Sequence, residues 1–135
     1  MTLSSSQFYQ VHRAPGSNAV PMHDVESAMP GYYSKPHRYY SDPTWPQSRE
    51  IESQKAILGS RGRPDNPVKV YRAVPQGVSD INSGDWVTPS LTYANNHNQN
   101  YFEGKGRVIS KTVPASHLRS NGNPTEWGYW PEEAK

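Results

Sequence analysis

The chain has 135 residues, a formal net charge of +2 and no cysteine. This length allows one hydrophobic core rather than two. Without cysteine there is no disulfide, thiolate-bound zinc, iron–sulfur cluster or cysteine nucleophile. The small net charge does not indicate a polyanion-binding surface, although a pI near 8.9 leaves nucleic acid open as a partner.

The N-terminal third is rich in Pro, Tyr, His and Ser, and we expect it to wrap the core of a single domain spanning residues 1–135. Residues 1–18 are predicted to be a flexible or wrapping arm. Asp24 can begin a short turn through Val25 and Met29, which Pro30 stops. No secretory signal and no apolar run of membrane-spanning length is visible, so we expect a cytoplasmic protein without a membrane partner.

Residues 48–58 form the clearest predicted helix. Ser48 is the expected N-cap and Gly59 the expected C-terminal stop. Glu50 and Glu52 lie near the positive end of this helix, and Ile51, Lys55 and Leu58 recur at helical spacing.

Residues 68–74 read as a strand with an arginine on its buried face. Alternate residues of a strand share a face, so Val68, Val70, Arg72 and Val74 point the same way. A charge is costly to desolvate alone, so an inward Arg72 implies an anion beside it or delivered to it.

Shorter elements follow this strand. Turns at residues 75–77 and 82–85 precede a strand at 86–88, and a short helix is expected over 92–98. A second good strand covers 107–113, and a turn at 121–124 delivers Glu126 into an aromatic block. Strands with short helices and long turns predict the α+β class.

The histidines do not form a metal-binding pattern. His12, His23, His37 and His117 show no spacing typical of zinc ligands, and His97 reads as a structural residue. Gly104-Lys105-Gly106 lacks the spacing of a phosphate loop. We therefore expect no metal cofactor.

Three segments together resemble a small mono-ADP-ribosyltransferase module of bacteriophage type. They are Tyr71-Arg72-Ala73-Val74-Pro75, the run from Gly84 to His97, and Glu126-Trp127-Gly128-Tyr129. The order Arg, Ser-x-Thr, Glu is similar to the arginine–serine–glutamate branch, the branch of cholera toxin. The resemblance covers most of residues 19–132.

This resemblance implies a fold and an activity. The fold would be an ADP-ribosyltransferase-like core of two small packed, mainly antiparallel sheets with short helices and long loops. The activity would be a glycosyltransferase reaction, in which ADP-ribose passes from the substrate NAD to a macromolecular acceptor and nicotinamide is released. For a phage protein acting in the host cytoplasm, as a host-takeover or anti-defence factor, a host protein is the favoured acceptor and nucleic acid the alternative.

The resemblance also assigns residues. Glu126, Arg72 and Ser90 would be catalytic, with Arg72 on the NAD phosphates and Ser90 on the nicotinamide-side ribose. The guanidinium fork suits phosphate oxygens, and a carboxylate stabilises the oxocarbenium-like transition state of glycosidic cleavage. The expected NAD-binding residues are Tyr71, Arg72, Ala73, Thr88, Ser90, Thr92, Trp86, Tyr93 and Trp127. Trp86, Tyr93, Trp127 and Tyr129 are the candidates for stacking on nicotinamide or excluding water.

The sequence departs from the family pattern in two places. The hydroxyl triplet aligns as Ser90-Leu91-Thr92 or as Thr88-Pro89-Ser90, and we favour Ser90 for the central role. Pro124 stands two residues before the catalytic glutamate, where the family often has Glu or Gln to orient the acceptor. The base on the acceptor side would then be Asp85, Glu103 or no residue at all.

Two other functions stay open beside the transferase. One is an NAD glycohydrolase of the same fold, which hands ADP-ribose to water. The other is a non-catalytic nucleic-acid-binding or virion-associated module, in which the tyrosines near Lys35, His37 and Arg38 stack on bases. The simplest alternatives for single residues are a strand-edge Arg72, a helix-capping Ser90 and a solvated Glu126.

Overall fold

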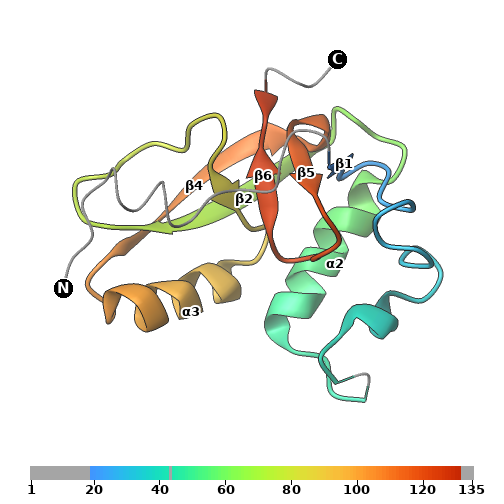
Figure 1. The fold of residues 1–135 in the computed structure, drawn as a ribbon, viewed down its shortest axis with the longest axis horizontal. Helices are drawn as coiled ribbons and strands as arrows, with labels where there is room; N and C mark the ends of the chain where they lie inside the picture. The colour runs from blue at the N-terminus through green and yellow to red at the C-terminus, as the bar shows by residue number, and fades with distance from the viewer. Residues whose placement is uncertain (1–18, 43, 132–135) are drawn as a thin grey trace.

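The computed structural model describes residues 19–42 and 44–131, and the predicted arm at residues 1–18 lies outside them. The described chain is a small α+β protein with two antiparallel sheets and two α-helices (Figure 1). The predicted α+β class and the mainly antiparallel pairing are therefore confirmed.

The first sheet has four short strands in the order β1 (Val20–Pro21), β5 (Leu118–Ser120), β6 (Trp127–Tyr129) and β3 (Trp86–Val87). The second is a long ribbon in which β2 (Pro67–Val74) pairs with β4 (Arg107–Pro114) along its full length. The two sheets meet where Tyr71 and Thr88 exchange backbone hydrogen bonds of 2.8 and 2.9 Å. This junction brings the end of β3 against the middle of β2.

The helices lie beside these sheets in different places. α2 (Ser48–Ser60) and α3 (Leu91–Phe102) contact each other, and α3 also packs against β2 and β4 (Figure 1). Two 3-10 turns complete the described elements, η1 (Pro36–Tyr39) and η2 (Ala115–His117). The helix expected at 92–98 is present and extends one turn further.

The buried face of β2 is as predicted. Val68, Val70, Arg72 and Val74 are all buried, and Arg72 has no exposed surface. The neighbouring Ala73 is buried as well, because α3 and β3 of the first sheet pack against this strand.

The segment after residue 18 wraps the core, as expected. Met22, Val25, Met29 and Tyr32 are buried within the main apolar cluster. The Met22 backbone N–H donates to the Leu118 carbonyl at 2.9 Å, which holds the wrap against β5. In Figure 1 this blue segment curves around α2.

The predicted helix is present as α2, but the predictions of Ser48 as its N-cap and Gly59 as its stop were wrong. Gln47 is the N-cap, and it forms a capping box with Glu50. The helix continues through Gly59 to Ser60, and Ile51 and Leu58 are 40% and 38% exposed. The buried stripe is instead Glu50, Ser53, Ile57 and Ser60. Two of these residues are serines, whose small side chains let the helix lie close to its neighbours. Counting apolar residues on each face of the helix therefore could not locate the buried face.

Candidate functional site

The anion beside Arg72 is a carboxylate of the same chain, that of Asp85. The Nη1 of Arg72 donates to the Trp86 carbonyl at 2.7 Å, and its Nε lies 3.9 Å from Oδ2 of Asp85. The guanidinium carbon also lies 5.3 Å from the centre of the Trp86 ring, within cation–π range. The inference of a partner anion is thus confirmed, and the partner is the carboxylate of Asp85.

Burial and bonding restrict what these two charges can do. Arg72 is fully buried and Asp85 is 5% exposed. Burial raises the pKa of Asp85, and a backbone N–H from Asn82 and the charge of Arg72 offset part of that rise. Both charged groups are therefore enclosed by protein, and the guanidinium lies against the Trp86 carbonyl and the Asp85 carboxylate.

Ser90 is the N-cap of α3. Its Oγ accepts from the Tyr93 backbone N–H at 3.0 Å, and its own N–H donates to Thr88 Oγ1 at 3.1 Å. Ser90 and Thr88 have no exposed surface. The capping alternative for Ser90 is therefore confirmed, and its hydroxyl is directed into the protein.

Glu52 on α2 accepts hydrogen bonds from the residues at the start of α3. Its Oε1 accepts from Ser90 Oγ at 2.9 Å and from the Thr92 N–H at 3.1 Å, while its Oε2 accepts from Thr92 Oγ1 at 2.7 Å. Although partial burial acts in the opposite direction, hydrogen bonds from Thr92 and Ser90 lower the pKa of Glu52. We call these three residues the Glu52 clasp, and it fixes α3 to α2.

Glu126 lies just before β6 and is half-buried. The Tyr93 hydroxyl donates to its Oε1 at 2.7 Å, and the Asn123 side-chain amide donates to its Oε2 at 3.2 Å. Burial and the neighbouring carboxylate raise the pKa of Tyr93, so the phenol remains the donor at neutral pH. The carboxylate is thus held in one orientation by groups from α3 and from the turn before β6.

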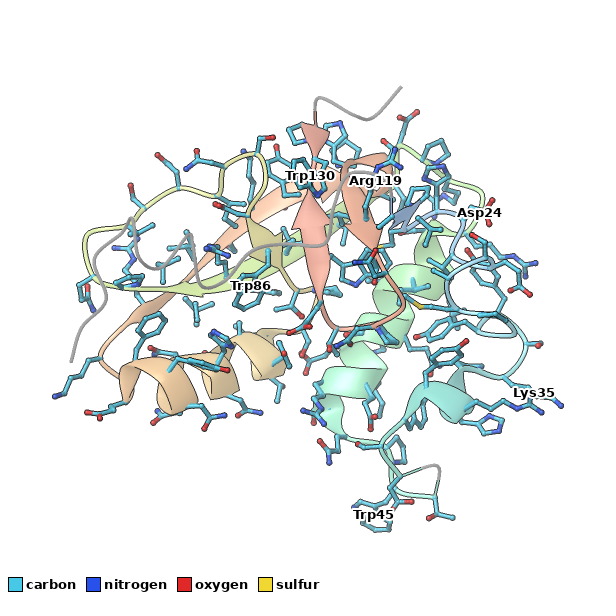
Figure 2. All side chains as sticks on the ribbon, in the orientation of Figure 1. Asp24, Lys35, Trp45, Trp86, Arg119 and Trp130 are labelled. Carbon is cyan, nitrogen blue, oxygen red and sulfur yellow. The ribbon has the colours of Figure 1, made fainter. Side chains whose placement is uncertain are left out.

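The three residues predicted as catalytic are connected through two aromatic rings. Arg72 contacts Trp86, and Trp86 meets Tyr93 edge-on with ring centres 6.3 Å apart. Tyr93 then bonds Glu126 with its hydroxyl and the Ser90 side chain with its backbone N–H. Figure 2 shows Trp86 at the centre of the molecule, above α3. The structure brings the three side chains to one region without placing them in direct contact.

The other predicted NAD-binding residues lie in less accessible positions. Ala73 and Trp127 have no exposed surface, and the Trp127 indole donates to the Pro124 carbonyl at 2.7 Å. Trp86 and Tyr129 are 6% and 7% exposed. Among the four stacking candidates, only Tyr93 presents a half-exposed ring, so stacking by the other three is not available in this arrangement.

Tyr71 and Glu103 lie outside the connected group, whereas His97 contacts it, with its ring centre 4.6 Å from that of Trp86. Tyr71 is half-buried, and its backbone is occupied by Thr88. Glu103 is exposed at the end of α3, 3.8 Å from Lys105. His97 stacks on Tyr101 with ring centres 4.2 Å apart, in keeping with its structural assignment.

A hollow of about 350 Å³ opens beside Tyr93 and the turn that precedes Glu126. Its aromatic lining is Tyr32, Tyr39, Tyr40 and Tyr93, its charged lining is Arg38, Arg49 and Glu50, and the turn contributes residues 123–125. This volume is at the lower end of the roughly 300–1,000 Å³ typical of small-molecule sites. We call it the tyrosine–arginine hollow.

Sequence reasoning missed Glu52, Arg49 and the hollow. Arg38 was named in the nucleic-acid-binding alternative; it is exposed and lines this hollow. A carboxylate two positions after Glu50 carries no distinguishing signal, because its partners are separated from it by about 40 positions. No local pattern was available to find these groups.

No family model, curated protein or solved structure matches this chain. Within residues 19–42 and 44–131, no helix combines the length and the apolar character that crossing a bilayer requires. In the same ranges, no group of three or more His, Cys, Asp or Glu side chains is arranged to hold a metal ion.

Proposed function

We propose that this chain is a mono-ADP-ribosyltransferase, built on an ADP-ribosyltransferase-like core and acting as a phage host-takeover or anti-defence factor. It cleaves the bond between nicotinamide and ribose in NAD and transfers ADP-ribose to a macromolecular acceptor. The observation that carries this proposal is the set of contacts from Arg72 through Trp86 and Tyr93 to Glu126. Residues remote in sequence thereby fix one half-exposed carboxylate at the edge of a hollow.

Glu126 is the proposed catalytic residue. As the C1′–N1 bond breaks, positive charge develops on the ribose ring, and a carboxylate held beside it stabilises that charge. Tyr93 and Asn123 donate to its two oxygens, so the carboxylate is already oriented before substrate binds. Preorganised charge of this kind is worth about 3 to 4 kcal/mol, or roughly 10²–10³ in rate.

The proposed roles of Arg72 and Ser90 change with their surroundings. Both side chains are fully buried. We therefore propose them as positioning residues: Arg72 sets the strand that carries Trp86, and Ser90 sets the first turn of α3, which carries Tyr93. This replaces the expected direct contacts with the NAD phosphates and ribose.

A pair of proteins tests the chemistry. Wild type and Glu126→Gln are incubated with NAD labelled in the adenylate half and with bacterial lysate, and free nicotinamide is measured. The wild type should release nicotinamide roughly 10²–10³ times faster than the variant. Equal rates in two equally folded proteins would refute the enzymatic role of Glu126.

Tyr93→Phe isolates the hydrogen bond to Glu126. The phenylalanine ring keeps the packing against Trp86 but cannot donate to the carboxylate, so nicotinamide release should slow by about tenfold, less than in Glu126→Gln. Tyr101→Phe is the control, because Tyr101 is 60% exposed and its ring stacks on His97, with ring centres 4.2 Å apart. An equal loss in both variants would contradict the assigned role.

A specific observation also favours a second candidate, an NAD glycohydrolase. The hollow beside Tyr93 is bordered by Pro124, which offers no side-chain acid or base for an acceptor. Labelled ADP-ribose would then stay free in solution while nicotinamide is released. Attachment of label to macromolecules distinguishes the transferase, and digestion by nuclease or protease identifies the acceptor class.

A further inference from the structure

We propose that the tyrosine–arginine hollow binds one nucleotide of a single-stranded nucleic acid, and that this nucleotide is the acceptor of ADP-ribose. The inference rests on the proposed function. The charge and shape of this hollow, which lies next to Glu126, favour one class of acceptor over the others.

The walls of the hollow are aromatic and held in place. The Tyr39 hydroxyl donates to the Pro30 carbonyl at 2.8 Å, and the Tyr40 hydroxyl donates to Gln54. Tyr32 is buried, with its ring centre 5.3 Å from that of Tyr39. Since these contacts come from the chain itself, the rings are ordered before a ligand arrives. The half-exposed rings of Tyr39, Tyr40 and Tyr93 are available to stack on any nucleobase, and the buried Tyr32 packs against Tyr39.

The charge of the hollow is positive. Arg38 and Arg49 line it, and neither forms an ion pair with a residue that the structure describes. Glu50 is the acid in the lining, but its Oε1 accepts from the Gln47 N–H at 2.9 Å. Its Oε2 accepts from the Ser41 N–H at 2.5 Å and from Ser41 Oγ at 3.2 Å.

This charge pattern discriminates between acceptors. An arginine or lysine side chain entering the hollow would meet two guanidinium groups and a carboxylate that is already bonded. A phosphodiester would instead meet two unpaired guanidiniums, whose planar fork suits phosphate oxygens. A nucleotide therefore fits the lining better than a basic protein side chain does.

The hollow is adjacent to the proposed reaction centre. Tyr93 and Asn123 both line it, and both donate to the Glu126 carboxylate, at 2.7 and 3.2 Å. A volume of about 350 Å³ suits one nucleotide better than a dinucleotide such as NAD. The site is thus the right size for an acceptor unit presented to NAD bound alongside.

The transfer balances as a substitution at C1′ of the nicotinamide-side ribose. The C1′–N1 bond to nicotinamide breaks, and its electron pair leaves with the neutral nicotinamide ring. A nitrogen lone pair of the acceptor base forms the new C1′–N bond, and the proton lost from that nitrogen passes to the Glu126 carboxylate and then to solvent. No further reactant is needed.

Binding is tested without NAD first. A fluorescent single-stranded 12-nucleotide DNA of mixed sequence is titrated with wild type, Arg49→Gln, Arg38→Gln and the control Arg107→Gln, and anisotropy is measured at two salt concentrations. Loss of one phosphate contact should weaken binding about 10- to 100-fold in each hollow variant and leave the exposed β4 control near wild type. Equal affinity in all four proteins would overturn the proposed site.

The acceptor role is tested with NAD present. Label from NAD should appear on the oligonucleotide and not on an arginine-rich peptide, and excess unlabelled NAD should not displace the oligonucleotide. Label on the peptide alone, or competitive displacement by NAD, would overturn the acceptor assignment even if nicotinamide is released. Oligonucleotide binding that depends on Arg38 and Arg49 without any nicotinamide release would instead refute the transferase proposal and leave the nucleotide site standing.

Discussion

Replacing Arg72 by methionine tests whether the buried guanidinium is a structural partner of Asp85. Methionine keeps much of the length of the side chain but removes the charge, the donor to the Trp86 carbonyl and the cation 3.9 Å from Asp85. Removing one partner of a buried ion pair typically costs about 3–5 kcal/mol, because the other charge remains desolvated. The pair is not in direct hydrogen-bond contact, so we expect the lower end, about 3 kcal/mol.

Urea unfolding followed by tryptophan fluorescence measures this loss. With a slope of about 1.5–2 kcal/mol per molar urea, the midpoint should fall by about 1.5–2 M. The double variant Arg72→Met/Asp85→Asn removes the stranded charge as well, and asparagine can still accept the Asn82 N–H that Asp85 accepts at 2.8 Å. The double variant should therefore recover about 1–2 kcal/mol relative to Arg72→Met.

The pH dependence of the stability deficit in Arg72→Met gives a second, independent test of Asp85 as the partner. Burial raises the pKa of Asp85 in the folded protein, and loss of the neighbouring cation raises it further. The folded variant then binds a proton more readily than its unfolded chain, so its deficit relative to wild type should shrink as the pH falls toward the ordinary aspartate value of about 3.9. A deficit that is constant with pH, together with no coupling in the double variant, would refute the assignment of Asp85 as the partner.

Two further predictions concern the Glu52 clasp and the close packing of Gly106 against Val74. Glu52→Gln should destabilise the fold by about 1–2 kcal/mol at pH 7, because the three donors at the start of α3 lose a charged acceptor. Since the folded pKa of Glu52 is lowered, its contribution is present above about pH 4.3 and is lost as the pH falls through the folded value; an urea-unfolding gap unchanged at low pH would contradict this. Gly106→Ala should cost about 1–3 kcal/mol, because its Cβ would lie 2.5 Å from the Val74 carbonyl oxygen. Gly59→Ala, in a helix with nothing within 4 Å of the new methyl group, should raise the melting temperature, and a lower one in both variants would argue against the packing explanation.

Sequence periodicity was sufficient to predict an element and its buried face where one repeating side-chain pattern determines both. The alternation in residues 68–74 predicted both the strand and the burial of Arg72, because a two-residue period assigns each side chain to a face. The same reasoning predicted that an anion must lie nearby. It did not identify Asp85 as that anion, since the choice depends on how β3 docks on β2 rather than on any local pattern.

Periodicity predicted the helix α2, but it does not locate a buried face that depends on small or polar side chains. In α2 the apolar positions Ile51 and Leu58 face outward, while Ser53 and Ser60 are buried. Glu50 is buried because its carboxylate closes the capping box and binds Ser41, a partner outside the helix. The helical pattern of apolar residues reports only hydrophobicity. These buried contacts are hydrogen bonds to segments distant in the sequence, so the pattern does not reveal them.

The candidate site is harder still to predict, because its parts come from separate segments. The tyrosine–arginine hollow combines η1, the start of α2, one residue of α3 and the turn before β6. The motif order indicated that Arg72, Ser90 and Glu126 belong together, but it could not distinguish a residue that touches a ligand from one that positions it. Burial makes that distinction, since two of the three side chains are inside the protein.

This difference in burial separates the two roles by experiment. Arg72 acts through Trp86, so its loss should reduce stability and activity together. Glu126 is half-buried, and within residues 19–42 and 44–131 its carboxylate accepts from Tyr93 and Asn123, so its loss should reduce activity with little effect on stability. For each variant, the loss of reaction rate can be plotted against the loss of unfolding free energy. Variants of positioning residues should then show correlated losses and fall along a diagonal. The variant of the catalytic carboxylate should lie far from that diagonal. If Glu126→Gln fell on the same diagonal as Arg72→Met, the carboxylate would be one more structural contact, and the reaction centre would have to lie elsewhere.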